Sequence, residues 1–569
     1  MTNLTPNPDT SARLDYAIAG GGVSGLYTAW RLLADAAKKK RPQPKITIYE
    51  SSAEIGGRLL TWLPLGQDSG LRAELGGMRF MKSQQLVWSL LHDGGLGFTS
   101  EDIIDFPVSG DHWRLLLRGQ SIGMPKTPHA EDWERASERY HFDDDEAERH
   151  KQSPGDIVAE IFTMVLEQND ISSAPTTREG WDAIKPELTW YGKPLWDIGF
   201  WNLLSDECSP ETYQYIVDAF GYFSIASNWN AAEAMQTIML DFRGEDFYTL
   251  KNGYMSLPTY LAKALEHKVE IQRSTRLATF SKRADDALEL VLVGPTGRRF
   301  TATADRLVLA MPRRALELIS TPASLFDIPG KRYLKRLVTS VTPIPAFKLF
   351  LFYKDRWWQE LEPPMTVGRS VCDLPIRQTY YMRPDDLAST TAGLIMASYD
   401  DARAVDYWQG LVPRDDQLAE GRLQLLEALA AFAQVLGADM TGVEQREPPP
   451  HLHKAPEEMV NHARRQLARL HDIPPESVPQ PEIGAFADWG LDPFGGGWNF
   501  WTAQTDVREV MTQIKTPLGA DERVYIVGDG YSGVQGWVEG ALTATEVVLT
   551  KHLGAERPEW LPEDYYLGW

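Results

Sequence analysis

A glycine-rich turn between a short apolar strand and a helix constrains the fold of this chain more than any other feature. The strand is expected over residues 16–19, the turn reads Gly20-x-Gly22-x-x-Gly25, and the helix is expected over residues 26–36. Gly20 allows a tight turn, Gly22 lets the backbone approach a pyrophosphate, and Gly25 lets helix and strand pack closely. The N–H groups of the first helical turn would face the phosphates. The sequence therefore predicts a dinucleotide-binding βαβ unit.

The second strand of this unit, residues 46–49, ends at Glu50. A carboxylate there can accept hydrogen bonds from both hydroxyls of a ribose, and it would repel a 2′-phosphate, which argues against NADP. The chain continues into Gly56-Gly57-Arg58, a loop that an NAD dehydrogenase does not require. A guanidinium binds phosphate oxygens with two parallel hydrogen bonds, so Arg58 suits a pyrophosphate. A surface arginine after a turn is the alternative.

This extended motif resembles the FAD motif of flavin-containing amine oxidases, and most closely that of L-amino-acid oxidases. The end of the chain resembles the same family, with a strand over 523–527, then Gly528-Asp529, and a helix expected over 542–553. The resemblance implies FAD as the cofactor, with the last helix end under the flavin ring, where it can stabilise negative charge. The implied cofactor-binding residues are Gly20, Gly22, Val23, Ser24, Gly25, Glu50, Gly57, Arg58, Gly76, Gly77, Met78, Arg79, Val269, Gly528, Asp529, Trp537 and Val538.

The resemblance also implies the domain organisation. We expect an α/β fold with a Rossmann-like FAD-binding domain of the amine-oxidase type, an inserted α+β substrate domain and a helical subdomain. A chain of 569 residues is too long for one simple core, which agrees with two or three intertwined domains. The FAD-binding domain would comprise residues 14–82, 250–312 and 484–556, the helical subdomain 83–249, and the substrate domain 313–483.

Composition restricts the partners and the compartment. A net charge of −22 argues against nucleic acid or an anionic membrane as a partner. No apolar run approaches the ~18 residues needed to cross a bilayer, and the first residues lack the apolar core of a signal peptide. The two cysteines, Cys208 and Cys372, provide neither a disulfide framework nor a metal site. We therefore expect a cytoplasmic protein, and the resemblance adds a homodimer.

Several elements outside the cofactor motifs are also predicted. Strands are expected at 288–293 with 300–302, and in the substrate part at 346–353, 377–382 and 393–399. Helices are expected at 416–436 and 456–470. Ser209 before Pro210 is typical of a helix start. The charge-dense residues 128–152 are interpreted as a solvated helix and loop.

Arg79 is the strongest substrate signal. It ends the run Gly76-Gly77-Met78-Arg79, and the family has a Gly-x-Met-Arg segment beside the flavin. In the L-amino-acid oxidases this arginine holds the α-carboxylate of the substrate. A fork-shaped cation suits a carboxylate because two hydrogen bonds fix orientation as well as charge. The alternative is that Arg79 contacts only FAD or a neighbouring acid.

Lys348 lies in the otherwise apolar run 346–353. An unpaired lysine is costly to bury, so such a position indicates a function or an outward-facing side chain. The family has a lysine in a matching strand, held through water near the flavin and assisting its reoxidation by O₂. The resemblance assigns Lys348 this role.

The remaining substrate contacts are inferred from the same resemblance. Tyr399, at the end of a strand, would give the carboxylate a second hydrogen bond, with Ser398 as the alternative because a slip of one residue reverses the face of a side chain. Trp537 would wall the substrate side of the flavin. Further wall candidates are Trp498, Trp501 and the segment 220–229.

Together these residues predict oxidative deamination of an L-α-amino acid with a bulky, aromatic or basic side chain, giving a 2-oxo acid, ammonia and hydrogen peroxide. The predicted catalytic residues are Lys348, Arg79, Tyr399 and Trp537. No metal is expected, since His451 and His453 have no further ligands nearby in the sequence. Three alternatives stay open: an amine oxidase for substrates without a carboxylate, an amino-acid 2-monooxygenase, and a non-catalytic flavin-binding scaffold.

Overall fold

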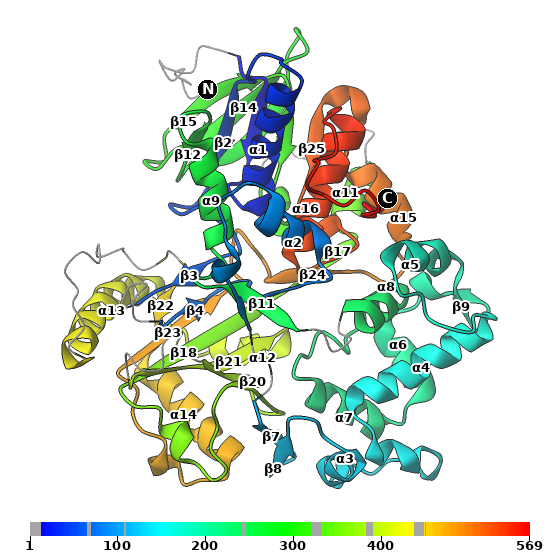
Figure 1. Cartoon of the computed structure of the whole chain (residues 1–569), viewed down its shortest axis with the longest axis vertical. Coiled ribbons are helices and arrows are strands. Elements are labelled where there is room, and N and C mark those ends of the chain that lie inside the picture. Colours follow the sequence, from blue (N-terminus) through cyan, green and yellow to red (C-terminus); the bar gives the residue numbers. More distant parts are fainter. Residues whose placement is uncertain are drawn as a thin grey trace.

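The computed structural model describes residues 13–64, 70–106, 108, 110–241, 246–319, 332–382, 391–436, 449 and 451–569. Three regions can be followed in Figure 1. A parallel sheet with its helices lies at the top of the view, next to both marked chain ends. A large sheet with α13 (Asp415–Leu436) and α14 (Glu457–His471) lies at the lower left. A group of helices that includes α4 (Pro154–Gln168), α6 (Phe200–Glu207) and α7 (Pro210–Phe220) lies at the lower right.

The parallel sheet is assembled from segments that are far apart in the sequence. Its five strands have the order β12-β2-β1-β16-β25, and every neighbouring pair is parallel. Apolar residues fill these strands because helices cover the sheet. The predicted α/β fold with a Rossmann-like cofactor domain is confirmed. The strands are β1 (Tyr16–Ala19), β2 (Ile46–Tyr49), β12 (Glu270–Gln272), β16 (Leu307–Leu309) and β25 (Val524–Ile526).

The helices of this region begin earlier than the sequence indicates. Helix α1 (Val23–Lys38) starts directly after Gly22, and α16 (Val538–Val547) starts directly after Trp537. Helix α1 packs against α16 and against α9 (Ser256–Leu265). The predicted hairpin is present as β14 (Leu288–Val293) and β15 (Arg299–Ala304), and β13 (Arg276–Lys282) adds a third strand.

The large sheet has eight strands in the order β22-β23-β18-β21-β20-β19-β7-β8. All neighbours are antiparallel except β19 and β7. The three strands predicted in the substrate part are confirmed as β18, β20 and β21. The bounds are β7 (His112–Leu117), β8 (Gln120–Pro125), β18 (Ala346–Tyr353), β19 (Gly368–Cys372), β20 (Gln378–Met382), β21 (Gly393–Asp401), β22 (His453–Lys454) and β23 (Ile483–Asp488).

Strands β7 and β8 come from the segment 83–249, which was expected to be mainly helical. Their pairing with β19 brings that segment into the large sheet. The reason is a local apolar run, since Leu115, Leu116 and Leu117 are buried. The strands are short and stand close to charge-dense residues, which conceals their pattern in the sequence.

The helical region has the predicted helix start at Ser209. The Ser209 side chain accepts a hydrogen bond from the N–H of Thr212, and Pro210 opens α7. Ser153 caps α4 in the same way through Asp156. The helices are α4 (Pro154–Gln168), α5 (Arg178–Ile184), α6 (Phe200–Glu207), α7 (Pro210–Phe220) and α8 (Ala231–Gln236), and in the substrate part α12 (Arg403–Gln409), α13 (Asp415–Leu436) and α14 (Glu457–His471).

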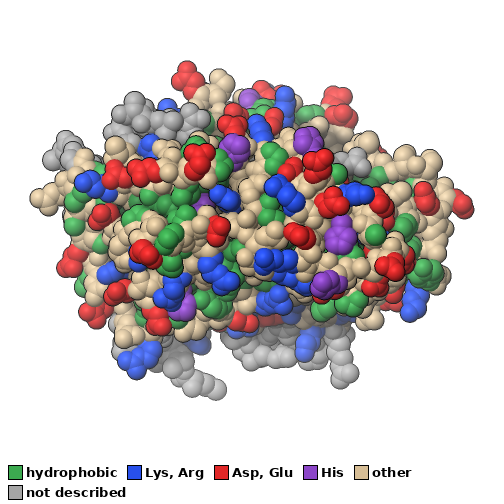
Figure 2. Space-filling model, turned by 90° about the horizontal axis from the view of Figure 1, so that it is seen from below, with side chains coloured by type: hydrophobic (Ala, Val, Ile, Leu, Met, Phe, Trp, Pro, Cys, Tyr) green, Lys and Arg blue, Asp and Glu red, His purple; other side chains and the backbone are tan. Residues whose placement is uncertain are grey.

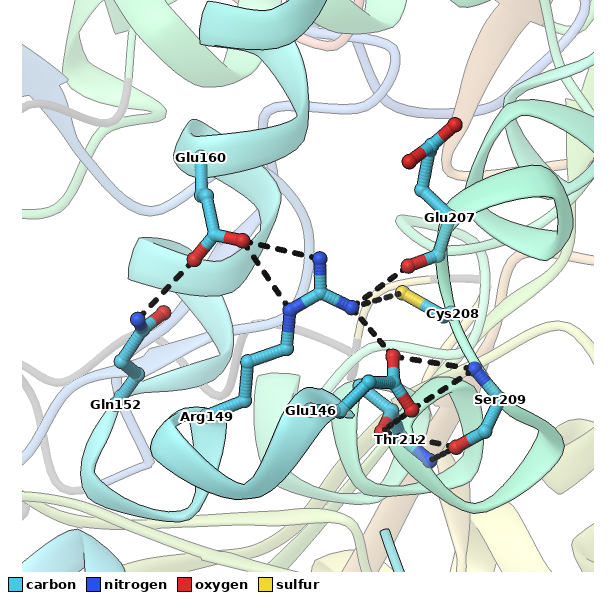
Figure 3. A network of polar contacts seen from close by, with 8 residues as sticks. All are labelled: Glu146, Arg149, Gln152, Glu160, Glu207, Cys208, Ser209 and Thr212. Atoms are coloured by element: carbon cyan, nitrogen blue, oxygen red, sulfur yellow. Dashed lines mark hydrogen bonds and ion pairs between the residues drawn. The ribbon is translucent and has the colours of Figure 1, made fainter. Parts of the chain in front are cut away.

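The charge-dense segment is less solvated than its composition indicates. The side chains of Glu146 and Arg149 are each 9 % exposed and form an ion pair. Figure 3 shows how Arg149 also reaches Glu160 on α4, at 3.0 Å, and the carbonyl of Glu207 on α6, at 2.6 Å. Glu146 accepts from the N–H of Ser209 before α7. The expectation of a solvated segment is wrong for these two residues, because their charges hold three helices together.

Charge on the molecular surface is mixed on the face shown in Figure 2. Acidic and basic side chains are both spread over that face, and several of the lysines and arginines lie near its middle. Among the described residues, no helix combines the length and the apolar character that crossing a membrane requires.

Candidate active site

A cavity lies beyond the carboxyl ends of the parallel strands. This is where ligands bind in open α/β sheets. Its lining includes β-strand ends, the loop around Gly57 and the first residues of α16. The predicted cofactor-binding residues that line it are Gly20, Gly22, Val23, Ser24, Glu50, Gly57, Arg58, Gly77, Arg79, Gly528, Asp529, Trp537 and Val538.

The three glycines of the turn have different physical roles. Gly20 has a φ of +117°, and a Cβ there would lie 2.1 Å from the carbonyl oxygen of Ala310. A Cβ on Gly25 would lie 1.9 Å from the carbonyl oxygen of Gly20. In contrast, a Cβ on Gly22 would meet nothing closer than 3.8 Å. The protein itself does not require glycine at position 22, so the free space there suits the close approach of a ligand.

The start of α1 suits a phosphate. Its cap residue is Gly22, which has no side chain to cap the free N–H groups, and the first turn carries no acid. A helix N-terminus of this kind attracts anions through its N–H groups and its dipole. The pyrophosphate of a dinucleotide therefore has a place at this end of the cavity.

Glu50 supplies the acid expected for a ribose. Its Oε2 accepts from the N–H of Gly21 at 2.6 Å, and its Oε1 accepts from the N–H of Ser52 at 2.7 Å. Burial raises the pKa of the Glu50 carboxyl, while these two hydrogen bonds oppose the shift. The bonds fix the orientation of the carboxylate at the edge of the cavity.

Arg58 and Asp529 join the two ends of the chain across the cavity. Arg58 Nη2 forms an ion pair with Asp529, and Nη1 donates to the carbonyl of Gly497 at 3.0 Å. Asp529 also accepts from the N–H of Gly536, 3.3 Å away, just before α16. The residues present thus fit FAD: an anion site at α1, an oriented acid at Glu50, a guanidinium at Arg58, and a second helix start beside Trp537.

Four predicted cofactor residues do not line this cavity. Gly25 has the packing role described above. Gly76 has a packing role as well, since a Cβ there would lie 1.9 Å from the carbonyl oxygen of Arg58. Met78 is buried with its sulfur 3.7 Å from Lys348 Nζ, and the N–H of Val269 donates to the carbonyl of Leu265. Cofactor contacts of these four residues stay predictions.

Sequence reasoning missed part of the cavity wall. One part follows β12, where the chain turns into β13, and another follows β16, where the chain leaves the sheet. A Pro-Phe-Gly-Gly-Gly run forms a third part, and that run was a visible signal. The missed residues of these three parts include Thr275, Arg276, Leu277, Ala310, Met311, Pro312, Pro493, Phe494 and Gly497.

Arg79 lines the same cavity and is surrounded by aromatic rings. Its guanidinium lies 4.3 Å from the ring centre of Phe247 and 5.7 Å from that of Phe106. Its Nη1 donates to the Tyr380 hydroxyl at 3.3 Å. No carboxylate of the described residues is paired with it. A half-buried guanidinium without an acid partner is suited to an anionic group from a ligand.

Tyr399 faces Arg79, and Ser398 faces away. The Tyr399 ring lies 5.4 Å from that of Tyr222 and 6.3 Å from that of Tyr380. Ser398 is fully buried and donates to Asp400 at 2.5 Å. Three tyrosines thus gather near Arg79. Tyr399 was singled out from the sequence and Tyr222 lies in the predicted wall segment 220–229, but Tyr380 was missed. Tyr380 could have been found from the alternation of strand β20.

Lys348 lies below this group, in the interior of β18. It is 2 % exposed, and its Nζ donates to the carbonyls of Glu74 at 2.9 Å and Gly76 at 2.6 Å. Burial lowers the pKa of Lys348 to about 7, with Glu74 opposing the shift and Arg79 adding to it. The Nζ also lies 4.6 Å from the ring centre of Tyr399. Lys348 does not line the cavity; it fixes the segment that carries Arg79.

The predicted aromatic walls differ in position. Trp537 lines the cavity, and its ring is nearly parallel to that of Phe247 at 6.3 Å. Trp498 meets the Tyr222 ring at 5.9 Å. Trp501 is 1 % exposed and donates to the carbonyl of Ser532, so it is a core residue and the prediction of a wall there is wrong. His451 packs against Trp489 and Phe494, and the described part of the chain holds no cluster of metal-ligating side chains.

Comparisons with known proteins agree with this arrangement. The chain is 24% identical to aplysianin-A from Aplysia kurodai over 565 residues, covering 95% of this chain and 91% of that protein. It is 24% identical to an L-amino-acid oxidase from Mus musculus over 409 residues, covering 71% and 56% of the two chains. A solved structure of a putrescine oxidase mutant with redesigned cofactor binding superimposes with a TM-score of 0.61 at 15% identity, covering 96% of this chain and 99% of that one.

The family profile described as flavin containing amine oxidoreductase matches residues 23–446 and 447–548, which is most of the chain. The match includes β2, the large sheet, Asp529 and all of α16, and so extends over both the cofactor cavity and the surroundings of Arg79. FAD is the cofactor that the family and the cavity indicate. From the fold, the cavity and this match, the chain belongs to the flavin-containing amine oxidoreductase family.

Proposed function

We propose that this protein oxidises an L-α-amino acid to a 2-oxo acid, with release of ammonia and hydrogen peroxide. The observation that carries the proposal is Arg79, a cation that lines the cofactor cavity and has no acid partner among the described residues. A carboxylate bound there would gain two hydrogen bonds in partly dehydrated surroundings. The similarity to an L-amino-acid oxidase supports the same activity.

Each protein group has a separate task in this proposal. Arg79 binds the α-carboxylate, and the Tyr399 hydroxyl donates a second hydrogen bond to it. The Phe247 ring packs on the guanidinium of Arg79, Trp537 stacks on Phe247, and these rings exclude water. Lys348 donates to the carbonyls of Glu74 and Gly76, and so fixes the position of the backbone segment that leads to Arg79. Two-point binding of this kind directs the Cα–H of the substrate toward the cofactor.

Bound FAD supplies the electron acceptor for C–N oxidation and passes the electrons to O₂. Gly20, Gly22 and Arg58 would hold its pyrophosphate, Glu50 a ribose, and the start of α16 the ring end. The tyrosines near Arg79, together with Trp498, favour a bulky apolar or aromatic side chain. The dimeric state and the cytoplasmic location expected from the sequence stay predictions.

The test compares an amino acid with its decarboxylated analogue. Purified FAD-loaded protein should consume O₂ with L-phenylalanine, while phenethylamine should be a poor substrate. Arg79→Met should lower kcat/KM for L-phenylalanine by about 100-fold or more, because a charge pair of this kind contributes about 3 kcal/mol or more. Activity on phenethylamine should change by less than about threefold.

Arg79→Lys is the matched control, since it keeps the positive charge and loses the fork-shaped guanidinium. Its kcat/KM for L-phenylalanine should lie between that of the parent protein and that of Arg79→Met. The proposal fails if the parent protein oxidises phenethylamine as fast as L-phenylalanine; an amine oxidase would then be the better description. Release of phenylacetamide and CO₂ in place of the 2-oxo acid would identify a 2-monooxygenase.

A further inference from the structure

The loop after α7 brings one tyrosine from the helical region to the large sheet. The loop begins at Gly221, whose φ of +87° ends the helix, and continues with Tyr222, Phe223 and Ser224. The Tyr222 ring stands edge-on to Tyr399 at 5.4 Å and to Trp498 at 5.9 Å. Tyr222 is therefore the helical region's contact with the surroundings of Arg79.

Asp401 binds this loop from the end of β21. It is fully buried and lies two residues beyond Tyr399 on the same strand. Its Oδ1 accepts from the N–H of Phe223 at 2.8 Å, and its Oδ2 accepts from the N–H of Ser224 at 3.1 Å and from the Ser224 hydroxyl. One carboxylate thus fixes both residues that follow Tyr222.

Two further contacts hold the loop on either side of Tyr222. The Gln378 amide on β20 donates to the carbonyl of Gly221 at 3.1 Å. The Phe223 ring lies between two guanidiniums, 3.9 Å from that of Arg377 and 4.0 Å from that of Arg403. The backbone before and after Tyr222 is therefore tied to the sheet that carries Tyr399, which leaves the tyrosine little freedom to move.

We propose that Asp401 is a specificity-determining residue that acts through Tyr222. By seating the loop 222–224 on the sheet, it sets the distance between the Tyr222 ring and the Arg79–Tyr399 pair, and this distance defines the space for the substrate side chain. Asp401 is a positioning residue and touches neither substrate nor cofactor. The inference rests on the proposed function, in which Arg79 binds the α-carboxylate.

The experiment uses the FAD-loaded full chain and the variant Asp401→Asn. An amide nitrogen cannot accept from the Ser224 N–H or hydroxyl, so the loop loses one side of its anchor. Amide hydrogen exchange at 222–224 should become at least about tenfold faster. The ratio of kcat/KM for L-phenylalanine over that for L-alanine should fall at least about fivefold, through KM, while kcat for L-alanine changes less than about twofold.

Asp400→Asn is the matched control. Asp400 is equally buried one residue earlier, but it accepts from Ser398 and Trp408, not from the loop. Its variant should leave the exchange at 222–224 and the substrate ratio as in the parent protein. In a Tyr222→Ala background, Asp401→Asn should change the ratio no further, because a shared pathway makes the two effects non-additive.

Faster exchange with an unchanged substrate ratio would overturn the inference, and so would an equal fall of the ratio in the Tyr222→Ala background. Failure of the proposed function is seen separately, since the parent protein would then fail to oxidise L-phenylalanine before any variant is compared. A fold defect is recognised by loss of bound flavin, and Ser224→Ala, which removes only the hydroxyl donor, should then still show a smaller fall of the ratio.

Discussion

The cofactor cavity and the surroundings of Arg79 are neighbouring parts of one site, but they are built differently. The cofactor cavity uses glycines, strand ends and helix starts, most of them within short runs such as 20–25, 56–58 and 528–538. The surroundings of Arg79, which we propose as the substrate end, use side chains from separate elements: Arg79, Tyr222, Tyr380 and Tyr399. The backbone therefore decides what the cofactor cavity can bind. In the surroundings of Arg79, the placement of side chains across a sheet decides which ligand fits.

The largest effect is expected for Gly25→Val. A Cβ at this position would lie 1.9 Å from the carbonyl oxygen of Gly20, so α1 and β1 must separate. We expect the free energy of unfolding to fall by about 4 kcal/mol or more and bound FAD to be lost. Thermal unfolding and flavin absorbance measure both quantities.

Gly22→Val provides the contrast. Space around Gly22 is free to 3.8 Å, so the fold should keep its stability within about 1 kcal/mol. FAD affinity should fall about 100-fold, because the new side chain occupies the place of the pyrophosphate. If Gly22→Val and Gly25→Val lose stability equally, the two glycines do not have the separate roles described here, packing for Gly25 and ligand space for Gly22.

The family resemblance also assigns Lys348 a role in the reoxidation of the flavin, beyond its hold on the segment with Arg79. On that basis, Lys348→Met is expected to slow the reaction of the reduced enzyme with O₂ by about 100-fold. Its effect on substrate binding should be smaller, since the segment with Arg79 loses two hydrogen bonds from the lysine and shifts only slightly. Stopped-flow measurement of the two half-reactions separates these effects. An unchanged reaction with O₂ would remove Lys348 from the predicted catalytic residues.

The same variant has a pH signature in stability. The pKa of Lys348 is lowered to about 7 in the folded protein, from an ordinary value of 10.5. Between these values the unfolded chain holds a proton that the folded protein does not, so this group makes stability rise with pH. The parent protein should gain about 1 kcal/mol per pH unit over Lys348→Met from pH 7 to 9. The pKa of Lys515 is also lowered to about 7, but this residue is present in both proteins, so its contribution cancels in the difference between their stabilities.

The smallest effect is expected for Tyr399→Phe. Loss of one hydroxyl donor to the carboxylate should raise KM for L-phenylalanine about tenfold and change kcat less than about twofold. Ser398→Ala tests the strand register: Ser398 bonds Asp400 on the other face, so it should leave KM unchanged. The opposite pattern would mean that Ser398 faces the substrate.

The sequence was sufficient for the cofactor region because its signals are local. The spacing of three glycines, an acid at the end of the next strand and the run before Asp529 each lie within one segment, and β1, β2, β16 and β25 form where they indicate. The pairing of these strands followed from the resemblance, not from any single segment.

The substrate region was harder to predict, because its contacts cross the sheet. The sequence alone did not decide whether Tyr399 or Ser398 faces Arg79. Adjacent residues of a strand face opposite sides, and the register of β21 depends on its pairing with β18 and β20. Glu146 and Arg149 have the composition of a surface and are buried only because three helices meet there. The sequence also did not show whether Trp501 lies in the cavity wall or in the core, because only its packing in the folded protein decides this.

The order of the parallel sheet has a consequence for biosynthesis. Strand β25 and helix α16 complete the cofactor region, yet their residues are translated about 500 positions after those of β1. During synthesis on the ribosome, Arg58 therefore has no Asp529 to pair with until the segments between the two residues have been translated. Flavin loading is then a late event of folding, and shortening the chain before Val524 should abolish the cofactor site even though every glycine of the first motif is intact.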